Sequence, residues 1–88
     1  RTHNRAIEEL IEIVKNDTKD AKEVIYLVQH SNCLSDAEAL LERIKPIYAH
    51  NAKKFTLSVV PPTIGCHVGS GILSIGYIIL DGLKEKLD

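Results

Sequence analysis

The stretch Val24-Ile25-Tyr26-Leu27-Val28 decides the fold expected of this chain. It is short, apolar and rich in β-branched residues, which is typical of a strand buried on both faces or covered by helices on one side. The sequence Ser35-Asp36-Ala37-Glu38 follows it and matches a capping box, the signature of a helix N-terminus. A core-facing stripe at helical spacing continues from there: Ala37, Leu40, Leu41 and Ile44. A buried strand followed by an amphipathic helix indicates an α/β organisation.

Outward from this unit, the sequence predicts one more helix and two more strands. Apolar residues at helical spacing predict an amphipathic helix over residues 4–15, and Pro46 is expected to end or kink the second helix. Alternation predicts a half-buried strand over residues 55–60, and a last strand is expected over residues 72–79. We therefore expect an α/β (α+β) fold, a two-layer sandwich in which a small mixed or mostly antiparallel sheet carries helices on one face.

The 88 residues form at most one small domain. A chain of this length buries only roughly 60–65% of its unfolded surface, so its core is marginal without a partner or a second domain. Three strands make a narrow sheet, and one edge stays exposed unless something covers it. The chain also begins at Arg1, without Met, directly at a helix start. We expect residues 1–88 to be a single-domain fragment whose missing strands lie upstream of Arg1.

Composition argues against several classes of function. A net charge of −1, from 11 Lys and Arg against 12 Asp and Glu, gives no basic footprint for nucleic acid. Cys33 and Cys66 lack CxxC spacing and the four histidines lack metal-ligand spacing. We therefore expect neither a disulfide framework nor a metal or cofactor, and a reducing cytoplasm as the compartment. The longest apolar run, residues 72–80, is too short to span a bilayer.

Residues 63–71 are the candidate functional segment, because three of the five glycines gather there around His67. Glycine permits positive φ and close approach of a ligand to the backbone, and consecutive N–H groups in such a turn form an anion-binding concavity. His67 and Ser70 add side-chain donors. This pattern favours a polar clamp for a carboxylate or phosphate. The alternative, a tight hairpin between two strands in which His67 bonds a neighbouring carbonyl, remains equally open.

Catalysis receives little support from the sequence. Cys66 and His67 are adjacent on an extended stretch and point to opposite faces, so they are poorly placed to act as nucleophile and base. Cys66 is interpreted as a small buried apolar residue. His30, at the end of the central strand, is interpreted as a strand-end hydrogen-bonding residue that lies near His67 if the two strand ends are adjacent. Arg1 and Arg5 are candidate contacts for a protein partner or an anionic ligand, with a solvated surface as the alternative.

A resemblance to a known family sharpens this interpretation. The run Ile64-Gly65-Cys66-His67-Val68-Gly69-Ser70-Gly71-Ile72-Leu73-Ser74-Ile75 resembles the C-terminal signature of the DegV family, whose pattern is close to IGxHxGPGxLGI. Arg1-Thr2 with Arg5-Ala6-Ile7, and the strand ending at His30, also fit the family. Two positions depart from it: Ser70 stands where proline is usual, which implies a looser turn, and Ser74 where glycine is common.

The resemblance implies a function. DegV proteins are bacterial lipid-binding proteins of two domains that hold a long-chain fatty acid between the domains, and some present its carboxylate to a separate fatty-acid kinase. By this resemblance His67 meets the carboxylate, and Val68, Gly69, Ser70 and Gly71 shape the ligand-binding turn. Apolar residues on the inner face of the last strand line part of the acyl tunnel.

The same resemblance covers only the C-terminal portion of a DegV protein. The N-terminal DegV domain, with the hydroxyl residues that hold the carboxylate, is missing, so we expect the isolated piece to bind fatty acid weakly or not at all. Two alternatives stay open. One is a regulatory or kinase-coupled acyl-handling enzyme domain that uses His67, and the other is a structural interaction domain without a ligand.

Overall fold

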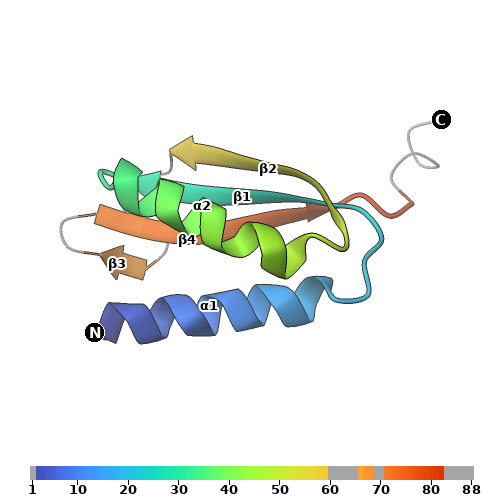
Figure 1. Ribbon diagram of the computed structural model, residues 1–88, viewed down its shortest axis with the longest axis horizontal. Coiled ribbons are helices and arrows are strands. Elements are labelled where there is room, and N and C mark those ends of the chain that lie inside the picture. Colours follow the sequence, from blue (N-terminus) through green and yellow to red (C-terminus); the bar gives the residue numbers. More distant parts are fainter. Residues whose placement is uncertain (1, 60–65, 69–70, 83–88) are drawn as a thin grey trace.

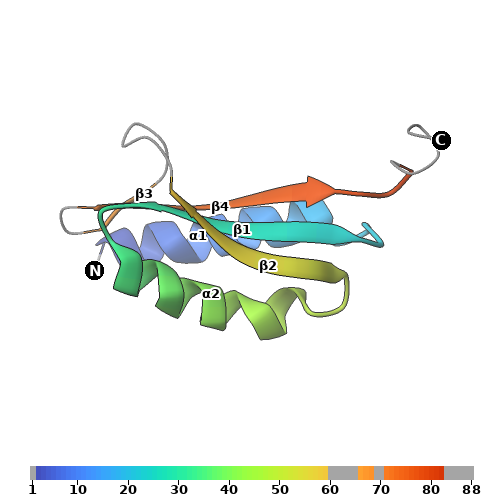
Figure 2. The ribbon, with the colours of Figure 1, turned by 90° about the horizontal axis from the view of Figure 1, so that it is seen from above.

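Two helices cover one face of a four-stranded mixed sheet in the computed structural model (Figures 1 and 2). The structure describes residues 2–59, 66–68 and 71–82. The elements are, in chain order, α1 (Thr2–Thr18), β1 (Val24–Ser31), α2 (Leu34–Tyr48), β2 (Ala52–Val59), β3 (Cys66–Val68) and β4 (Gly71–Ile79). This arrangement confirms the predicted two-layer α+β fold with helices on one face.

The sheet has the strand order β2-β1-β4-β3, so β1, which contains the apolar run Val24–Val28, lies inside the sheet between β2 and β4. β1 runs parallel to β2, to which it is joined through α2, and antiparallel to β4. β3 pairs antiparallel with the start of β4, from Val68 opposite Gly71 to Cys66 opposite Leu73. The sequence did not predict β3 as a strand, because its three residues lie among glycines and become a strand only by pairing with β4.

Both helices are longer than predicted, and one predicted cap is wrong. α1 continues to Thr18, whose hydroxyl donates to the carbonyl of Val14 at 2.8 Å. α2 begins at Leu34 with Cys33 as N-cap and without a side-chain cap hydrogen bond, so Ser35 is already helical and the capping box does not form. Pro46 lies inside α2, which ends two residues later at Tyr48, as expected of a residue without an N–H.

The core lies between the sheet and the two helices. The residues of β1 alternate between buried and half-buried, with Val24, Tyr26 and Val28 facing the helices. The Tyr26 ring stacks on Tyr48 of α2, with centroids 4.4 Å apart, and on Phe55 of β2 at 5.5 Å. The other fully buried apolar positions of the core are Ala37 and Ile44 of α2 and Leu73 of β4, and α1 adds the nearly buried Ile11 and Val14. The central strand therefore holds both helices to one sheet face.

The end of the sheet where β1 begins is held by buried polar contacts, and we call it the closed end. The Tyr26 hydroxyl lies 2.6 Å from Oδ1 of Asn51 and 3.0 Å from Oγ1 of Thr18. The Asn51 amide donates in turn to the carbonyl of Thr18 at 2.7 Å and to that of Ala21 at 3.3 Å. These bonds connect the end of α1, the turn after α2 and the start of β1, so their polar groups are satisfied inside the chain.

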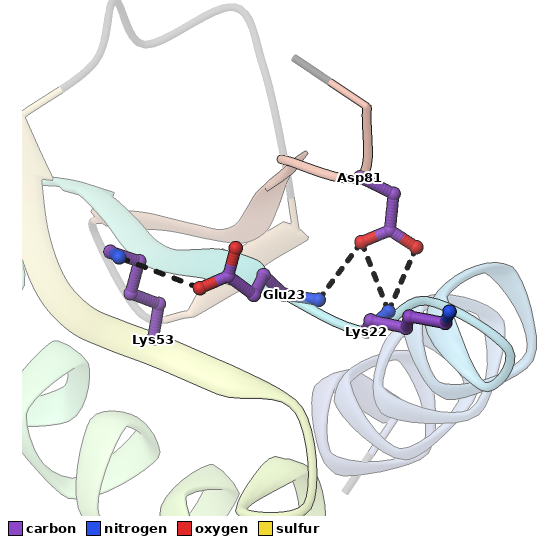
Figure 3. Close-up of polar contacts among 4 residues, drawn as sticks. All are labelled: Lys22, Glu23, Lys53 and Asp81. Atoms are coloured by element: carbon purple, nitrogen blue, oxygen red, sulfur yellow. Dashed lines mark hydrogen bonds and ion pairs between the residues drawn. The ribbon is translucent and has the colours of Figure 1, made fainter. Parts of the chain in front are cut away.

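Asp81, just after β4, adds a second fastening at the closed end (Figure 3). Its carboxylate accepts the backbone N–H of Lys22 at 2.9 and 3.0 Å and that of Glu23 at 2.9 Å. These hydrogen bonds hold the pKa of Asp81 below its ordinary value. Beside it, the N–H of Leu80 donates to the carbonyl of Glu23 at 2.8 Å, which ties the end of β4 to the start of β1.

Candidate functional site

The candidate site lies at the opposite end of the sheet, where β1 finishes and β4 begins, and we call it the site end. The starts of α1 and α2 and the whole of β3 lie at this end (Figure 1). The backbone of His67 pairs with Ile72 of β4, and Ile72 pairs on its other side with Ser31 of β1. The strand pairing thus places the candidate histidine position in one row with the last residue of the central strand.

His30 is buried at the site end with an unpaired ring nitrogen. It is 9% exposed, it belongs to the buried, helix-facing set of β1, and its Nδ1 has no hydrogen-bond partner among the described residues. A buried donor or acceptor without a partner costs about 1–3 kcal/mol. The sequence favoured a strand-end hydrogen-bonding residue here, whereas the structure leaves this nitrogen unpaired within the described part of the chain.

His30 and His67 do not lie on neighbouring strands. β4 separates β1 from β3 in the sheet, and His30 pairs with Leu73, whose partner on β3 is Cys66. His67 therefore falls one row further along the sheet than His30. The condition under which the sequence placed them close together, adjacent strand ends, is not met.

Gly71 is packed so closely that no side chain fits there. A Cβ at this position would lie 2.6 Å from Cβ of Cys33, 2.7 Å from the carbonyl oxygen of Ser31 and 2.8 Å from Sγ of Cys33. The Cys33 thiol also donates to the carbonyl of Ile72 at 3.2 Å. Glycine is required at Gly71 because β4 crosses directly against the β1–α2 connection, a role that the sequence attributed only to the shape of a turn.

The β1–α2 connection brings the N-terminus of α2 to the site end. Asn32 turns the chain with φ of 61°, in the left-handed region that Asn adopts more readily than most residues. Cys33 is the N-cap, but its thiol donates a hydrogen bond to the carbonyl of Ile72 and does not cap the helix. The first helical bond shown here runs from Ala37 N–H to the Cys33 carbonyl at 3.0 Å. The N–H groups before it give this end of α2 a partial positive charge.

The sheet face turned away from the helices carries both polar and apolar side chains along its whole length, from the buried Ile72 at the site end to Ile25, which pairs with the exposed Lys54 of β2. Near the site end, Gln29 pairs with Ser74 on one side and with Ser58 on the other, and all three are half-buried. Further along, Ile25 pairs with Ile78, which is 48% exposed. Neither helix covers this face (Figure 2). We call it the open face.

Gly76 leaves room on the open face for the Gln29 side chain. A Cβ at Gly76 would lie 3.1 Å from Oε1 and 3.4 Å from Cδ of Gln29, so the amide lies directly over this glycine. Leu27, the partner of Gly76 on β1, is half-buried beside it. The missing side chain therefore leaves space on the open face for the polar amide of Gln29, beside Leu27.

Most of the residues predicted from the sequence as ligand contacts are only partly placed. His67 and Val68 belong to β3 by their backbone, while their side chains lie outside the described part of the chain, as do Gly69, Ser70 and Arg1. Arg5 is exposed on α1. β2 and β4 are separated by β1, so the segment does not form a hairpin between these two strands; β4 pairs antiparallel with β3 instead. The polar clamp itself stays a prediction.

Two further observations concern metals and membranes. Within residues 2–59, 66–68 and 71–82, no three or more His, Cys, Asp or Glu side chains gather in a way that could hold a metal ion. In the same ranges, no helix has the length and apolar character needed to cross a membrane.

Comparison with known proteins gives one family. The sequence model of a family described as "Uncharacterised protein, DegV family" matches residues 1–80. A DegV domain-containing protein of Clostridium acetobutylicum is 34% identical over 77 residues, which cover 88% of this chain and 26% of that protein. DegV domain-containing proteins of two Staphylococcus aureus strains, COL and MSSA476, are each 32% identical over 87 residues, covering 99% of this chain and 29% of the relative. The chain thus spans less than a third of these curated relatives, and no solved structure matches it.

Proposed function

Because the chain belongs to the DegV family, we propose that it is the C-terminal portion of a longer bacterial, cytoplasmic protein that binds a long-chain fatty acid as a non-catalytic carrier. The observation that carries the proposal is the family match over residues 1–80, which includes the glycine-rich segment around His67. A carrier must hold a carboxylate at one end of its site and shield an acyl chain along the rest.

The carboxylate end of the proposed site is the segment from His67 to Gly71. Its backbone begins on β3, in the row that also contains Ser31. The N-terminus of α2, at the same end of the sheet, adds a favourable field for an anion. Within this segment, His67 and Ser70 supply side-chain donors and Gly69 gives access to the backbone. Gly71 ends the segment directly against Cys33 and the Ser31 carbonyl, where no side chain fits.

The acyl chain, in this proposal, lies along the open face. The helix-facing side of β4 offers no room, since Leu73 and Ile75 are 1% and 5% exposed and belong to the packed core. On the open face, Leu27 is half-buried and Ile78 largely exposed, so they present apolar surface. The ligand would then run from the site end along the β1 and β4 residues of the open face, past Leu27 towards Ile78. This placement replaces the expectation that the inner face of the last strand lines the tunnel, because that face is packed against the helices.

Two partners complete the proposed function. The N-terminal DegV domain supplies the other wall of the site, with hydroxyl groups for the carboxylate, because one sheet face cannot enclose an acyl chain by itself. A fatty-acid kinase is the proposed recipient of the presented carboxylate. Both follow from the family resemblance, and the exposed open face is consistent with a need for a covering element.

The test uses the longer protein purified from bacterial cells. Lipid is extracted and identified by mass spectrometry, and the melting temperature is measured with and without added long-chain fatty acid. We expect a bound acyl chain, and we expect His67→Ala to lower its occupancy at least about tenfold. His50→Ala is the matched control, because His50 is exposed in the turn between α2 and β2, at the closed end. Finding no acyl chain and no thermal effect in the wild-type protein would refute the proposal.

A further inference from the structure

The register of β2, β1 and β4 divides the open face into rows of side chains. The first row, at the site end, runs from Ser31 across β4 to the backbone of His67. Residues 31, 29, 27 and 25 of β1 each begin a row, because side chains alternate between the two faces of a strand. The last of these rows is that of Ile25, which pairs with Ile78 of β4 and with Lys54 of β2. The rows therefore lead from the candidate carboxylate position to the closed end.

Lys54 is the first charged residue that these rows present beyond the first one. It is exposed, and its partner Ile25 is half-buried. The two rows before it carry no Lys, Arg, Asp or Glu. They consist of Gln29 and Leu27 of β1, Ser58 and Thr56 of β2, and Ser74 and Gly76 of β4. A ligand that lies along the open face thus meets uncharged side chains on these strands until it reaches Lys54.

The closed end continues the charged boundary past Lys54. Lys53 is paired with Glu23, with Nζ and Oε2 3.5 Å apart. The carboxylate of Asp81 accepts the backbone N–H groups of Lys22 and Glu23 beside this pair (Figure 3). Placing hydrocarbon against such charges removes their hydration, which costs free energy. We call Glu23, Lys53, Lys54 and Asp81 the charged rim. An acyl chain gains no apolar contact by extending beyond it.

The distance from the first row to the charged rim corresponds to a definite length of acyl chain. Residues 31 and 25 of β1 are six positions apart, and a strand rises about 3.3 Å per residue, which gives about 20 Å. An extended chain advances about 1.2 Å per bond, since the three backbone bonds of an extended peptide residue span about 3.6 Å. A chain of about 16 carbons therefore reaches from a carboxylate at the first row to the row of Lys54.

We infer that Lys54 limits the acyl chain on the open face to about 16 carbons. The methylene stem of a lysine can cover the last carbons of such a chain while its ammonium group stays in water. A longer chain would place methylenes against the ammonium group and remove its water. The inference rests on the proposed function, to which it adds the length of the ligand and a residue that determines it.

The test measures how the affinity of the longer protein, stripped of lipid, depends on the length of the ligand. The ligands are saturated fatty acids of about 8 to about 20 carbons, in competition with a fluorescent fatty acid. In the wild-type protein, we expect each added pair of carbons to raise the affinity at least about threefold up to about 16 carbons, and to add nothing beyond. Lys54→Leu removes the charge, so the rise should continue to the longest acids.

Thr56→Lys moves the limit instead of removing it. Thr56 lies on the same strand, in the row of Leu27, two residues nearer the site end. Two residues correspond to about 7 Å or about 5 carbons, so the limit should fall to about 11 carbons. This variant keeps the edge strand β2 charged, which prevents pairing with another chain, and it remains informative if Lys54→Leu aggregates.

Lys15→Leu is the control for the loss of a lysine charge. Lys15 is exposed on α1, in the helix layer and away from the open face. Its replacement should leave the dependence of affinity on chain length unchanged.

Each outcome decides the inference. A length limit that disappears in Lys54→Leu, or that becomes shorter in Thr56→Lys, supports it. A limit that is the same in all variants, or a wild-type protein without a limit, overturns it and leaves the proposed function standing. Failure of the wild-type protein to bind any acid of the series contradicts the proposed function, and the inference falls with it.

Discussion

At the closed end, Tyr26 and Asn51 satisfy each other's hydrogen bonds inside the core, whereas at the site end the Nδ1 of His30 is buried without a partner among the described residues. Both ends use polar side chains on the helix-facing side of β1, four residues apart. At one end the polar groups fasten α1, β1 and the turn after α2 to one another. At the other end, the Nδ1 of His30 has no hydrogen-bond partner among the described residues and remains available to one from elsewhere.

This difference shows which end of so small a fold contributes more hydrogen bonds to its stability. A buried hydrogen bond contributes about 1 kcal/mol, and an unpaired buried polar group costs more than that. A domain of this length has little stability to lose. The closed end therefore secures the fold, and the site end has, among the residues that the structure describes, an unpaired group and a side-chain-free position, Gly71, next to the family signature.

The largest expected effect is that of Asn51→Ala, which removes the centre of the closed end. Asn51 is 5% exposed, and its loss leaves the Tyr26 hydroxyl and the Thr18 carbonyl without their present partner. We expect the free energy of unfolding to fall by about 3 kcal/mol, measured by urea denaturation. Combining the change with Tyr26→Phe should cost clearly less than the two single changes added together. Strict additivity would show that the two side chains do not act as one unit.

The next effect is that of Gly71→Ala at the site end. The added Cβ would lie 2.7 Å from the Ser31 carbonyl and 2.6 Å from Cβ of Cys33, so β4 or the β1–α2 connection must shift. We expect a loss of about 2 kcal/mol in unfolding free energy, or a fall in melting temperature of about 8–16 °C.

Gly82→Ala is the control for Gly71→Ala. Gly82 has φ of 75° and no atom within 4 Å of an added Cβ, so it measures backbone strain alone, about 1 kcal/mol. An equal or smaller loss at Gly71 would mean that the contacts there relax without resistance, and the site end would be less rigid than described.

His30→Phe compares the two ends directly, with Tyr26→Phe as its counterpart. Replacing His30 removes an unpaired buried nitrogen, so we expect the unfolding free energy to stay constant or rise by up to about 1 kcal/mol. Tyr26→Phe leaves Oδ1 of Asn51 without its hydrogen-bond donor, so we expect the unfolding free energy to fall by about 1–2 kcal/mol. Urea denaturation of both variants gives the comparison. If His30→Phe proved as destabilising as Tyr26→Phe, His30 would be satisfied within the chain and the two ends would not differ.

The helices and strands that are determined by local sequence patterns were predictable from the sequence. The apolar run of β1 and the helical spacing in α1 and α2 are local patterns, and each corresponds to an observed element. β3 is different, because it is a strand only through its pairing with β4. The capping box at Ser35 failed for a similar reason: Asn32 turns the chain earlier and the Cys33 thiol is held by Ile72, so α2 starts before the matching residues.

Candidate ligand-binding residues could be named only where a family pattern marks them, and their role stays a prediction. His67 was found through its glycine neighbours and the resemblance that they carry. Asn51 was missed, because a single polar residue in a turn gives no sign that its partners, Thr18 and Tyr26, lie far away in the sequence. The sequence also did not predict that the Nδ1 of His30 lacks a hydrogen-bond partner among the described residues, because this depends on the positions of polar groups in other elements. Hydrogen bonds between distant segments are the part of the structure that sequence patterns do not report.

The smallest expected effect is the pH dependence contributed by Asp81 at the closed end. The pKa of Asp81 is lowered in the folded chain, chiefly by the backbone N–H groups of Lys22 and then Glu23, relative to 3.8. Because the folded pKa lies below the unfolded one, the carboxylate stabilises the fold above the unfolded pKa. That contribution is lost as the pH falls through the folded pKa. Asp81→Asn should therefore lower the melting temperature at pH 7, and the difference from wild type should shrink as the pH falls from the unfolded pKa through the lowered folded one.

The control for Asp81→Asn is Asp20→Asn, an exposed carboxylate of the loop between α1 and β1. It should change the melting temperature less at pH 7, since a surface charge without a fixed partner contributes little. If the Asp81 variant instead lost the same number of degrees at pH 7 and at pH 3, the effect would come from the shape of the side chain. The charge of Asp81 would then play no part in fastening β4 to β1, and the closed end would depend on the buried Tyr26–Asn51 contacts alone.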